Sequence, residues 1–517
     1  MKPLTTSIYT FPDLIKGGYK YVDKTAYIYD LVKEYKAQYF LSRPRRFGKS
    51  LLVSTLKAIF QGQRDLFEGL AIADTDYDWK SYPVIHLDMG SISSATGEEL
   101  DANLLRLVRR TAQLYGAEVN ADYGYQAFDD LIHELVESRG NVVILIDEYD
   151  KPLLGHLGKE SAREIQDVLK SFYSVIKTTE PYQRFVLLTG VSRFSRVSIF
   201  SDLNNLTDLT MNYETATLLG YTQDELEANF ADYIQRLADQ EEKPYAQVVE
   251  GLRDWYNGYR FHHKAETVYN PVSVMKCLNA SEYANYWFET GTPTFLVELL
   301  KRQPMDMEDL SIQAEAISTY DPNDLEPLPL LFQTGYLTIQ GIEQIGEMRY
   351  YHLDYPNREI KQAFNYWLVR DFAEVPDPEL STALRGMVKS LQKCDIDAML
   401  EHLKTFFANI PNTITLEHEK YYQTIFFTVF KLIGAMIEAE VNTNTGRIDS
   451  VVKTDKYIYI FEFKLGGTAE EALQQIKDKQ YAAPYRDDSR TTTLVGVGFE
   501  RKSRNINTWL TETAANL

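Results

Sequence analysis

One short stretch of this chain constrains its fold more than any other. An apolar run, Ala37 to Leu41, has the length and character of a buried strand. It is followed by a basic loop ending in Gly48, Lys49 and Ser50, and then by Leu51 to Phe60, where apolar residues recur at helical spacing. A strand, a loop with Gly-Lys-Ser and a helix form the layout of a phosphate-binding loop. In such a loop, backbone N–H groups face an anion, the lysine reaches the terminal phosphates and the serine hydroxyl binds Mg²⁺.

The loop departs from the general pattern G-x-x-x-x-G-K-S at its first glycine, where this chain has Arg43. Because arginine does not readily adopt the positive-φ conformations open to glycine, we expect this loop to fold differently from the general one. Taken alone, Gly48 to Ser50 is equally compatible with a basic turn before an ordinary surface helix.

A second stretch, further along the chain, favours the phosphate-binding interpretation. An unbroken apolar run, Val142 to Ile146, ends in Asp147 and Glu148. Such runs are typical of strands buried on both faces in parallel sheets, and ligands bind at the carboxyl ends of those strands. We expect Asp147 to hold Mg²⁺, mostly through water, and Glu148 to take a proton from the water that attacks the γ-phosphate. The alternative is a pair of acids that merely ends a strand.

These two stretches also carry a resemblance to a known family. Arg43 to Ser50 and Ile146 to Pro152 resemble the bacterial AAA-ATPase-like family, whose members often carry a PD-(D/E)xK nuclease-like domain at the C-terminus. Arginine at position 43 is usual in that family. Further similar stretches are Tyr21 to Thr25, Phe200 to Leu206 and Thr290 to Pro293.

The resemblance implies ATP rather than GTP as the nucleotide, with Mg²⁺. The residues expected to bind them are Arg43, Arg46, Gly48, Lys49, Ser50, Leu51, Asp147 and Arg193, of which Ser50 and Asp147 would hold the metal. The lead-in residues Tyr21 and Lys24 are candidates to contact the base. In ATPases of this class, the strand Phe185 to Gly190 lies between the acid-tipped strand and the phosphate-loop strand. Thr189, Ser192 or Arg193 would then sense the γ-phosphate, although the threonine and serine are equally compatible with a structural cap.

Strands that alternate with helices predict an α/β fold with a parallel sheet. A chain of 517 residues is long enough for two to four domains. We expect a P-loop AAA-like ATPase core over 1–212, a helical lid and winged-helix-like segment over 213–355, a helical connector over 356–410 and a small PD-(D/E)xK nuclease-like α/β domain over 411–517. Winged helices can bind DNA, but no helix here is basic enough for recognition, so packing within the protein is the favoured role.

The C-terminal part contains a second constellation of charged residues. Two β-rich runs flank Asp455 and Lys456, which predicts a hairpin in which Asp449 lies opposite Glu462, with Cβ atoms about 5 Å apart. Alternation along the strand puts Lys464 on the same face as Glu462. Two such close carboxylates repel unless a cation such as Mg²⁺ lies between them, and the lysine could orient or deprotonate a metal-bound water.

Asp449, Glu462 and Lys464 match the core pattern of PD-(D/E)xK nucleases, so we expect Asp449 and Glu462 to bind metal and all three to be catalytic together with Glu148 of the ATPase. The alternative is an exposed hairpin with a Glu/Lys charge pair. By resemblance, Gln475 and Tyr481 help to bind metal or phosphate, and Glu419 is a possible extra acid. Thr468 and Glu471 form a helix capping box.

Composition limits the partners. The net charge of −20 disfavours indiscriminate nucleic-acid binding, so DNA contact requires local patches such as Arg501 to Arg504. Two distant cysteines, Cys277 and Cys394, are typical of a reducing cytoplasm, and no run is of membrane-spanning or signal-peptide character. Together with the two candidate sites, this leads us to expect a cytoplasmic protein that binds and hydrolyses ATP, is coupled to a Mg²⁺-dependent DNA nuclease domain and could form a homo-oligomer. The alternative is a nucleotide-driven switch or assembly protein whose nuclease-like domain binds without cutting.

Overall fold

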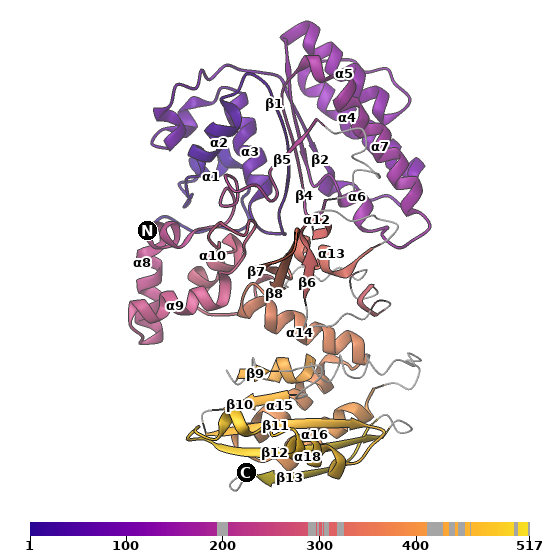
Figure 1. Ribbon diagram of the computed structural model, residues 1–517. Helices are drawn as coiled ribbons and strands as arrows, with labels where there is room; N and C mark the ends of the chain where they lie inside the picture. Colours follow the sequence, from indigo (N-terminus) through magenta and orange to yellow (C-terminus); the bar gives the residue numbers. More distant parts are fainter. Residues whose placement is uncertain are drawn as a thin grey trace. The chain divides into compact units, whose positions relative to one another are not determined.

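The computed structural model describes residues 1–193, 205–287, 296, 299–301, 303, 310–317, 325–410, 428–433, 440–442, 450–454, 456–500 and 505–514. The chain divides into two compact units. The first comprises Met1–Phe295 with Ser311–Glu359, and the second comprises Leu296–Leu310 with Ile360–Leu517 (Figure 1).

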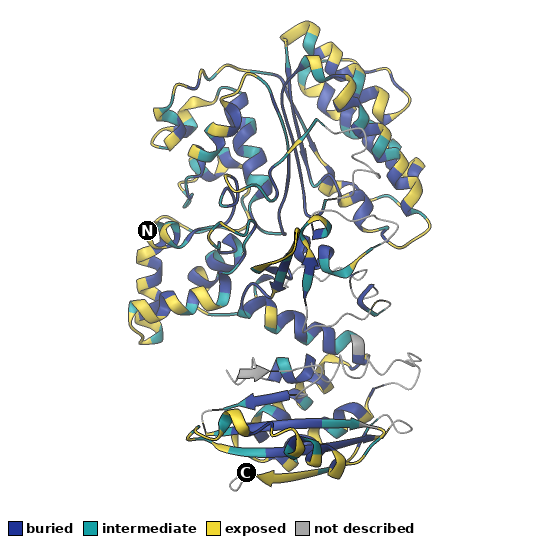
Figure 2. Cartoon of the chain, in the orientation of Figure 1, coloured by how far each residue is buried: buried dark blue, intermediate teal, exposed yellow. Residues whose placement is uncertain are grey.

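The first unit is built on a parallel sheet. Its described strands are β1 (Ala37–Ser42), β2 (Val84–Asp88), β3 (Val142–Asp147), β4 (Gln183–Gly190) and β5 (Thr207–Asp208), in the order β2-β3-β4-β1-β5. Each pairing between neighbours is parallel, and β4 lies between β3 and β1, so both predictions about this sheet are confirmed. All residues of β3 and β4 are buried, as the apolar runs Val142 to Ile146 and Phe185 to Leu188 indicate (Figure 2).

Helices cover both faces of this sheet. In Figure 1, α1 (Phe11–Lys16), α2 (Thr25–Val32) and α3 (Lys49–Phe60) lie on one side, and α4 (Gly97–Tyr115), α5 (Gly124–Arg139) and α7 (Ala162–Thr178) lie on the other. The short α6 (Lys151–Leu154) follows β3. Because Ser42 pairs with Gly190 and Asp88 pairs with Asp147, the loops that follow these strands all leave from one edge of the sheet.

The rest of the first unit is a helical lid and a small antiparallel sheet. The lid helices α8 (Gln223–Glu241), α9 (Tyr245–Tyr256) and α10 (Pro271–Ala280) pack around a shared apolar cluster. The winged-helix-like segment follows, with β6 (Ser311–Gln313), α12 (Ala314–Ile317), α13 (Pro327–Thr334), β7 (Thr338–Ile345) and β8 (Met348–Asp354). Its strands are antiparallel in the order β6-β8-β7.

The second unit combines helices with a mixed sheet. The helices are α14 (Arg358–Ala373), which begins at the end of the first unit, α15 (Asp377–Gln392), α16 (Ile396–Ala408) and α18 (Ala469–Asp478). The sheet has the order β13-β12-β11-β10-β9, formed by β9 (Glu440–Asn442), β10 (Ser450–Lys453), β11 (Tyr457–Leu465), β12 (Thr491–Glu500) and β13 (Asn505–Thr513). Only the β11–β12 pairing among these described strands is parallel.

The hairpin between β10 and β11 has the predicted register. Ser450 pairs with Phe461 and Lys453 with Ile458, and the Thr454 amide donates to the Tyr457 carbonyl at 2.8 Å. The capping box that starts α18 at Thr468 is also confirmed. Helix α18 approaches the sheet closely because β12 has glycine at position 496, where a Cβ atom would lie 2.4 Å from the Ala469 carbonyl oxygen.

Candidate functional site

The phosphate loop turns into α3 through a left-handed glycine. Gly48 has φ 89° and lies at the N-cap of α3, with no atom within 4 Å of the position a Cβ would take. Arg46 is also left-handed, with φ 67°, a conformation that costs an arginine energy. Lys49 folds back over the loop and donates from Nζ to the carbonyls of Arg43 (2.8 Å) and Pro44 (2.9 Å).

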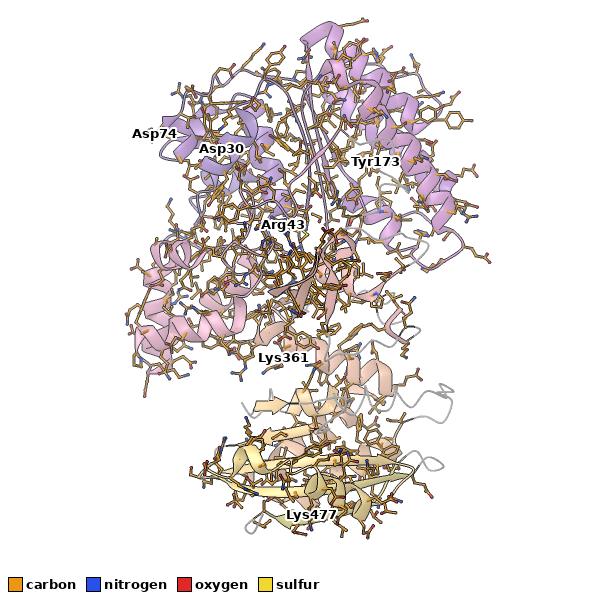
Figure 3. All side chains as sticks on the ribbon, in the orientation of Figure 1. Asp30, Arg43, Asp74, Tyr173, Lys361 and Lys477 are labelled. Carbon is orange, nitrogen blue, oxygen red and sulfur yellow. The ribbon has the colours of Figure 1, made fainter. Side chains whose placement is uncertain are left out.

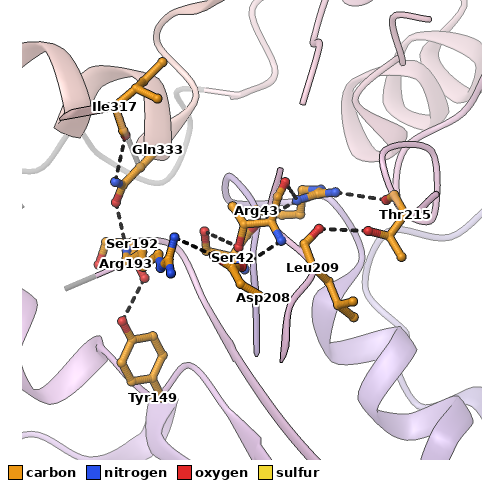
Figure 4. Close-up of polar contacts among 11 residues, drawn as sticks. Ser42, Arg43, Tyr149, Ser192, Arg193, Asp208, Leu209, Thr215, Ile317 and Gln333 are labelled. Carbon is orange, nitrogen blue, oxygen red and sulfur yellow. Dashed lines mark hydrogen bonds and ion pairs between the residues drawn. The ribbon is translucent and has the colours of Figure 1, made fainter. Parts of the chain in front are cut away.

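Arg43 anchors the start of this loop to a later segment of the first unit, which contains Thr210 and Thr215. Its side chain is buried, and it donates to the carbonyls of Ser42 (2.9 Å), Thr210 (2.7 Å) and Thr215 (3.0 Å) (Figures 3 and 4). The guanidinium also lies 4.1 Å from the ring centre of Phe261, within cation–π range. These carbonyls and this ring therefore occupy the guanidinium of Arg43. The nucleotide contact expected for Arg43 stays a prediction.

Further side chains of the loop are anchored by the surrounding fold. Pro44 packs directly on Gly335 at the end of α13, where an added Cβ would come within 2.6 Å of the proline Cβ. Phe47 is buried and its ring meets that of Tyr259 edge-on at 4.8 Å. Arg46 donates to the carbonyl of Tyr286. The sequence indicated that the loop folds differently, and the structure shows that side-chain anchors take the place of the missing glycine.

The two acids at the end of β3 lie close to this loop. Asp147 is buried, and its Oδ1 accepts hydrogen bonds from Thr189 Oγ1 at 2.5 Å and from the Glu148 amide at 3.1 Å. Burial lowers the pKa of Lys49, and the carboxylates of Asp147, Asp150 and Glu148 oppose that shift. The structure therefore brings the Gly-Lys-Ser turn and the acid-tipped strand together, as the interpretation of the sequence required.

Glu148, which follows Asp147, has an uncommon backbone conformation. It is partly buried and has φ 53°, which is uncommon for a residue other than glycine. Burial raises the pKa of its carboxyl group, while Lys49 partly opposes the shift. A carboxylate whose pKa is closer to neutral is a better proton acceptor under physiological conditions.

Asp150 is a structural member of the site to which sequence reasoning gave no role. Its buried Oδ2 accepts from the Val191 amide (3.0 Å), the Ser192 amide (2.7 Å) and Ser192 Oγ (2.6 Å). Burial raises the pKa of Asp150, and the two hydrogen bonds from Ser192 oppose the rise. The available signal in the sequence was an acid three residues after Asp147. The partners of Asp150, Val191 and Ser192, follow β4, so the sequence around β3 could not predict them.

The residues expected to sense the γ-phosphate are engaged within the fold. Thr189 bonds to Asp147 and Ser192 to Asp150, and Arg193 forms an ion pair with Asp208, Nη1 to Oδ2 at 2.6 Å (Figure 4). These contacts agree with the structural-cap interpretation of the threonine and serine. Contact of Arg193 with the nucleotide stays a prediction.

An open pocket adjoins the phosphate loop. Its walls are largely apolar and come from the lead-in, α3, the segment 218–221 and the start of α10. Arg46, Gly48, Leu51, Tyr21 and Lys24 line it, so five residues predicted to approach the nucleotide meet there. Its largely apolar walls are typical of small-molecule sites.

The second candidate site lies on β11. Glu462 is buried, with Lys464 Nζ 3.5 Å from its Oε1. Gln475 of α18 bridges the two, because its amide nitrogen donates to Glu462 and its amide oxygen accepts from Lys464. Tyr481 packs in an apolar cluster of this unit. Asp449 and Glu419 lie outside the described residues, as do Arg501 to Arg504.

The described part of the chain contains no group of three or more His, Cys, Asp or Glu side chains arranged to hold a metal ion. Of the two metal ligands predicted for the second unit, Asp449 and Glu462, only Glu462 lies among the described residues. Within the same described residues, no helix is both long and apolar enough to cross a membrane.

The geometry defines a class of protein: a phosphate-loop ATPase fold followed by a nuclease-like α/β unit. Residues 5–200 match the family described as "Predicted AAA-ATPase", and residues 417–509 match the PD-(D/E)XK nuclease superfamily. A protein of Azotobacter chroococcum mcd 1, "Uncharacterized protein in vnfD 5'region", is 38% identical over 520 residues, with 98% of each chain covered. The chain belongs to the same family as this relative, a family that joins a predicted AAA-ATPase to a PD-(D/E)XK nuclease superfamily domain.

Among solved structures, the chain aligns with the Aeropyrum pernix ORC1 protein in complex with DNA. The alignment covers 84% of this chain and 89% of that one, at 12% identity and a TM-score of 0.25. A similarity this low carries no argument about either protein.

Proposed function

We propose that the first unit binds and hydrolyses ATP with Mg²⁺, and that the second unit is a Mg²⁺-dependent nuclease acting on DNA. The observation that carries the first half is the cluster of Lys49 with Asp147, Glu148 and Asp150 at the carboxyl edge of a parallel sheet. Nucleotides bind at this edge in α/β folds.

The residues of the loop fit a triphosphate. The twelve-residue helix α3 begins at Lys49, so its first amide groups and its dipole favour an anion beside Gly48. The ammonium of Lys49 would exchange its two carbonyl acceptors for phosphate oxygens. The adjoining apolar pocket would take the base, with Leu51 and Tyr21 on its walls.

A hydroxyl and a carboxylate are suitable oxygen ligands for Mg²⁺, so Ser50 and Asp147 would hold it. Bound Mg²⁺ would supply positive charge against the charge that develops on the phosphates. Thr189 fixes the orientation of Asp147 through its 2.5 Å hydrogen bond. Glu148, with its raised pKa, would accept a proton from the attacking water.

The nuclease half rests on Glu462 and Lys464, which Gln475 holds together on one face of β11. Continuing the observed hairpin register by one pair would place Asp449 opposite Glu462. These two carboxylates would then hold the metal, and Lys464 would orient the attacking water. The cytoplasmic location, the division into four domains and a homo-oligomeric state stay predictions.

The two activities are tested with one set of variants. Lys49→Ala should abolish ATP binding and hydrolysis, and Asp449→Ala or Glu462→Gln should abolish cleavage of plasmid and oligonucleotide DNA while leaving the ATPase intact. Lys464→Arg keeps the positive charge but alters its geometry, so its rate of DNA cleavage should lie between those of the wild type and Glu462→Gln. Metal-dependent cleavage that survives Asp449→Ala would rule out the assignment of the nuclease site.

A second candidate function is a nucleotide-driven switch whose nuclease-like unit binds nucleic acid or a protein partner without cleaving. The net charge of −20 favours this candidate in the form that binds a protein partner, because an acidic body repels the phosphate backbone. Mg²⁺ binding by the wild type without cleavage of any single- or double-stranded substrate would support this candidate against the nuclease.

A further inference from the structure

The segment Val191 to Arg193, directly after β4, is held by side chains from several elements. Asp150 accepts from the first two amides, and Tyr149 Oη donates to the Ser192 carbonyl at 2.9 Å. The Arg193 amide donates to Oε1 of Gln333 on α13 at 2.7 Å (Figure 4). The last of these contacts comes from the winged-helix-like segment, far from this strand in sequence.

Gln333 is fixed in one orientation by two different partners. It is buried, and its amide nitrogen donates to the Ile317 carbonyl at 3.3 Å while its amide oxygen accepts from Arg193. An amide side chain that is flipped would face a carbonyl with its oxygen and an N–H with its nitrogen, losing both bonds. The side chain is therefore a rigid support for the Arg193 amide.

The same corner of α13 also contacts the phosphate loop. Gly335, two residues after Gln333, ends α13 with φ 89° and packs on Pro44. The corner thus supports the two loops that leave β1 and β4, which are neighbouring strands. Both loops lie at the sheet edge where we place the triphosphate.

We propose that Gln333 is a positioning residue for ATP hydrolysis, through which the winged-helix-like segment completes the nucleotide site of its own chain. Gln333 holds the Arg193 amide, next to Ser192, whose amide and hydroxyl donate to Asp150, one of the acids that act on Lys49. The inference rests on the proposed ATPase function and assigns a part of that site to a segment outside the ATPase core.

The test compares steady-state ATP hydrolysis by the full-length wild type and two variants of residue 333. Gln333→Met keeps the length of the side chain but removes the acceptor, and should lower kcat about tenfold, equivalent to about 1.4 kcal/mol, with KM changed less than twofold. Gln333→Glu keeps an acceptor for the Arg193 amide but sets a second oxygen against the Ile317 carbonyl, so it should recover only part of the rate.

The matched control is Ser311→Ala. It removes the 2.8 Å hydrogen bond between Ser311 Oγ on β6 and His352 Nδ1 on β8, which lies within the same winged-helix-like segment. It should lower the melting temperature without lowering kcat. A wild-type rate in Gln333→Met, or an equal loss in Ser311→Ala, would overturn the positioning role alone. A wild type without ATPase activity would instead overturn the proposed function and this inference with it.

Discussion

Replacing Arg43 by glycine restores the first glycine of the general phosphate-loop pattern, yet we expect it to destabilise the protein. The change removes the Arg43 donor from the carbonyls of Ser42, Thr210 and Thr215, of which Thr215 keeps the Leu218 amide at 3.2 Å. Each buried acceptor left without a donor costs about 1–3 kcal/mol. Loss of the stacking on Phe261 adds about 1–2 kcal/mol, and relief of the buried charge offsets part of the total. The net loss in unfolding free energy should be about 3–6 kcal/mol.

Urea unfolding followed by circular dichroism measures this loss for the first unit. Arg45→Gly is the matched control, since it adds the same glycine to the same loop at a partly exposed position and should cost only about 1 kcal/mol. ATP affinity should fall in Arg43→Gly as well, because the loop is no longer anchored. Equal unfolding midpoints for the two variants would refute the view that side-chain anchors replace the missing glycine.

Three further predictions follow from single residues. Burial raises the pKa of Glu359 from 4.5 to about 7, so the folded state favours its protonated form. Its contribution to stability should fall by roughly 3 kcal/mol as the pH rises from below 4.5 through 7, and Glu359→Gln should remove that slope in urea titrations at pH 5 and 8. Gly258→Ala should prevent folding or cost more than about 3 kcal/mol, because φ is 98° and the new Cβ would lie 1.8 Å from the Pro356 carbonyl oxygen. Gly116→Ala is the control, because φ is 67° but the new Cβ would meet no atom within 4 Å, so it should cost only about 1 kcal/mol. Equal melting temperatures for the Gly258 and Gly116 variants would contradict the predicted clash. Glu148→Gln should lower ATP hydrolysis at least about 100-fold with ATP binding kept, and an unchanged rate would exclude it as the base.

Much of the fold could be predicted because the patterns that indicate its strands and helices involve residues close together in the sequence. The apolar run of β3 and the helical period of α3 can each be read from neighbouring residues. The hairpin register followed from the assumption of a two-residue loop between two β-rich runs, and the structure confirms it over the described pairs. The closeness of Lys49 to Asp147 followed from the rule that parallel strands end at one sheet edge.

The partners of the bulky loop residues could not be predicted in this way. Arg43 reaches a carbonyl 167 residues along the chain, and the amide of Arg193 reaches Gln333 over 140 residues. No periodicity links such positions, since their meeting depends on how the lid and the winged-helix-like segment pack against the sheet.

The sequence by itself determined the parallel sheet, the phosphate loop with its acids, and the strand that carries Glu462 and Lys464. Only the tertiary structure decided how a loop without its first glycine is held, and that Asp150 and Gln333 support the segment after β4. The reason is physical: strands and helices follow from short-range periodicity, whereas a buried polar group takes whichever partner the packed chain brings within hydrogen-bonding distance.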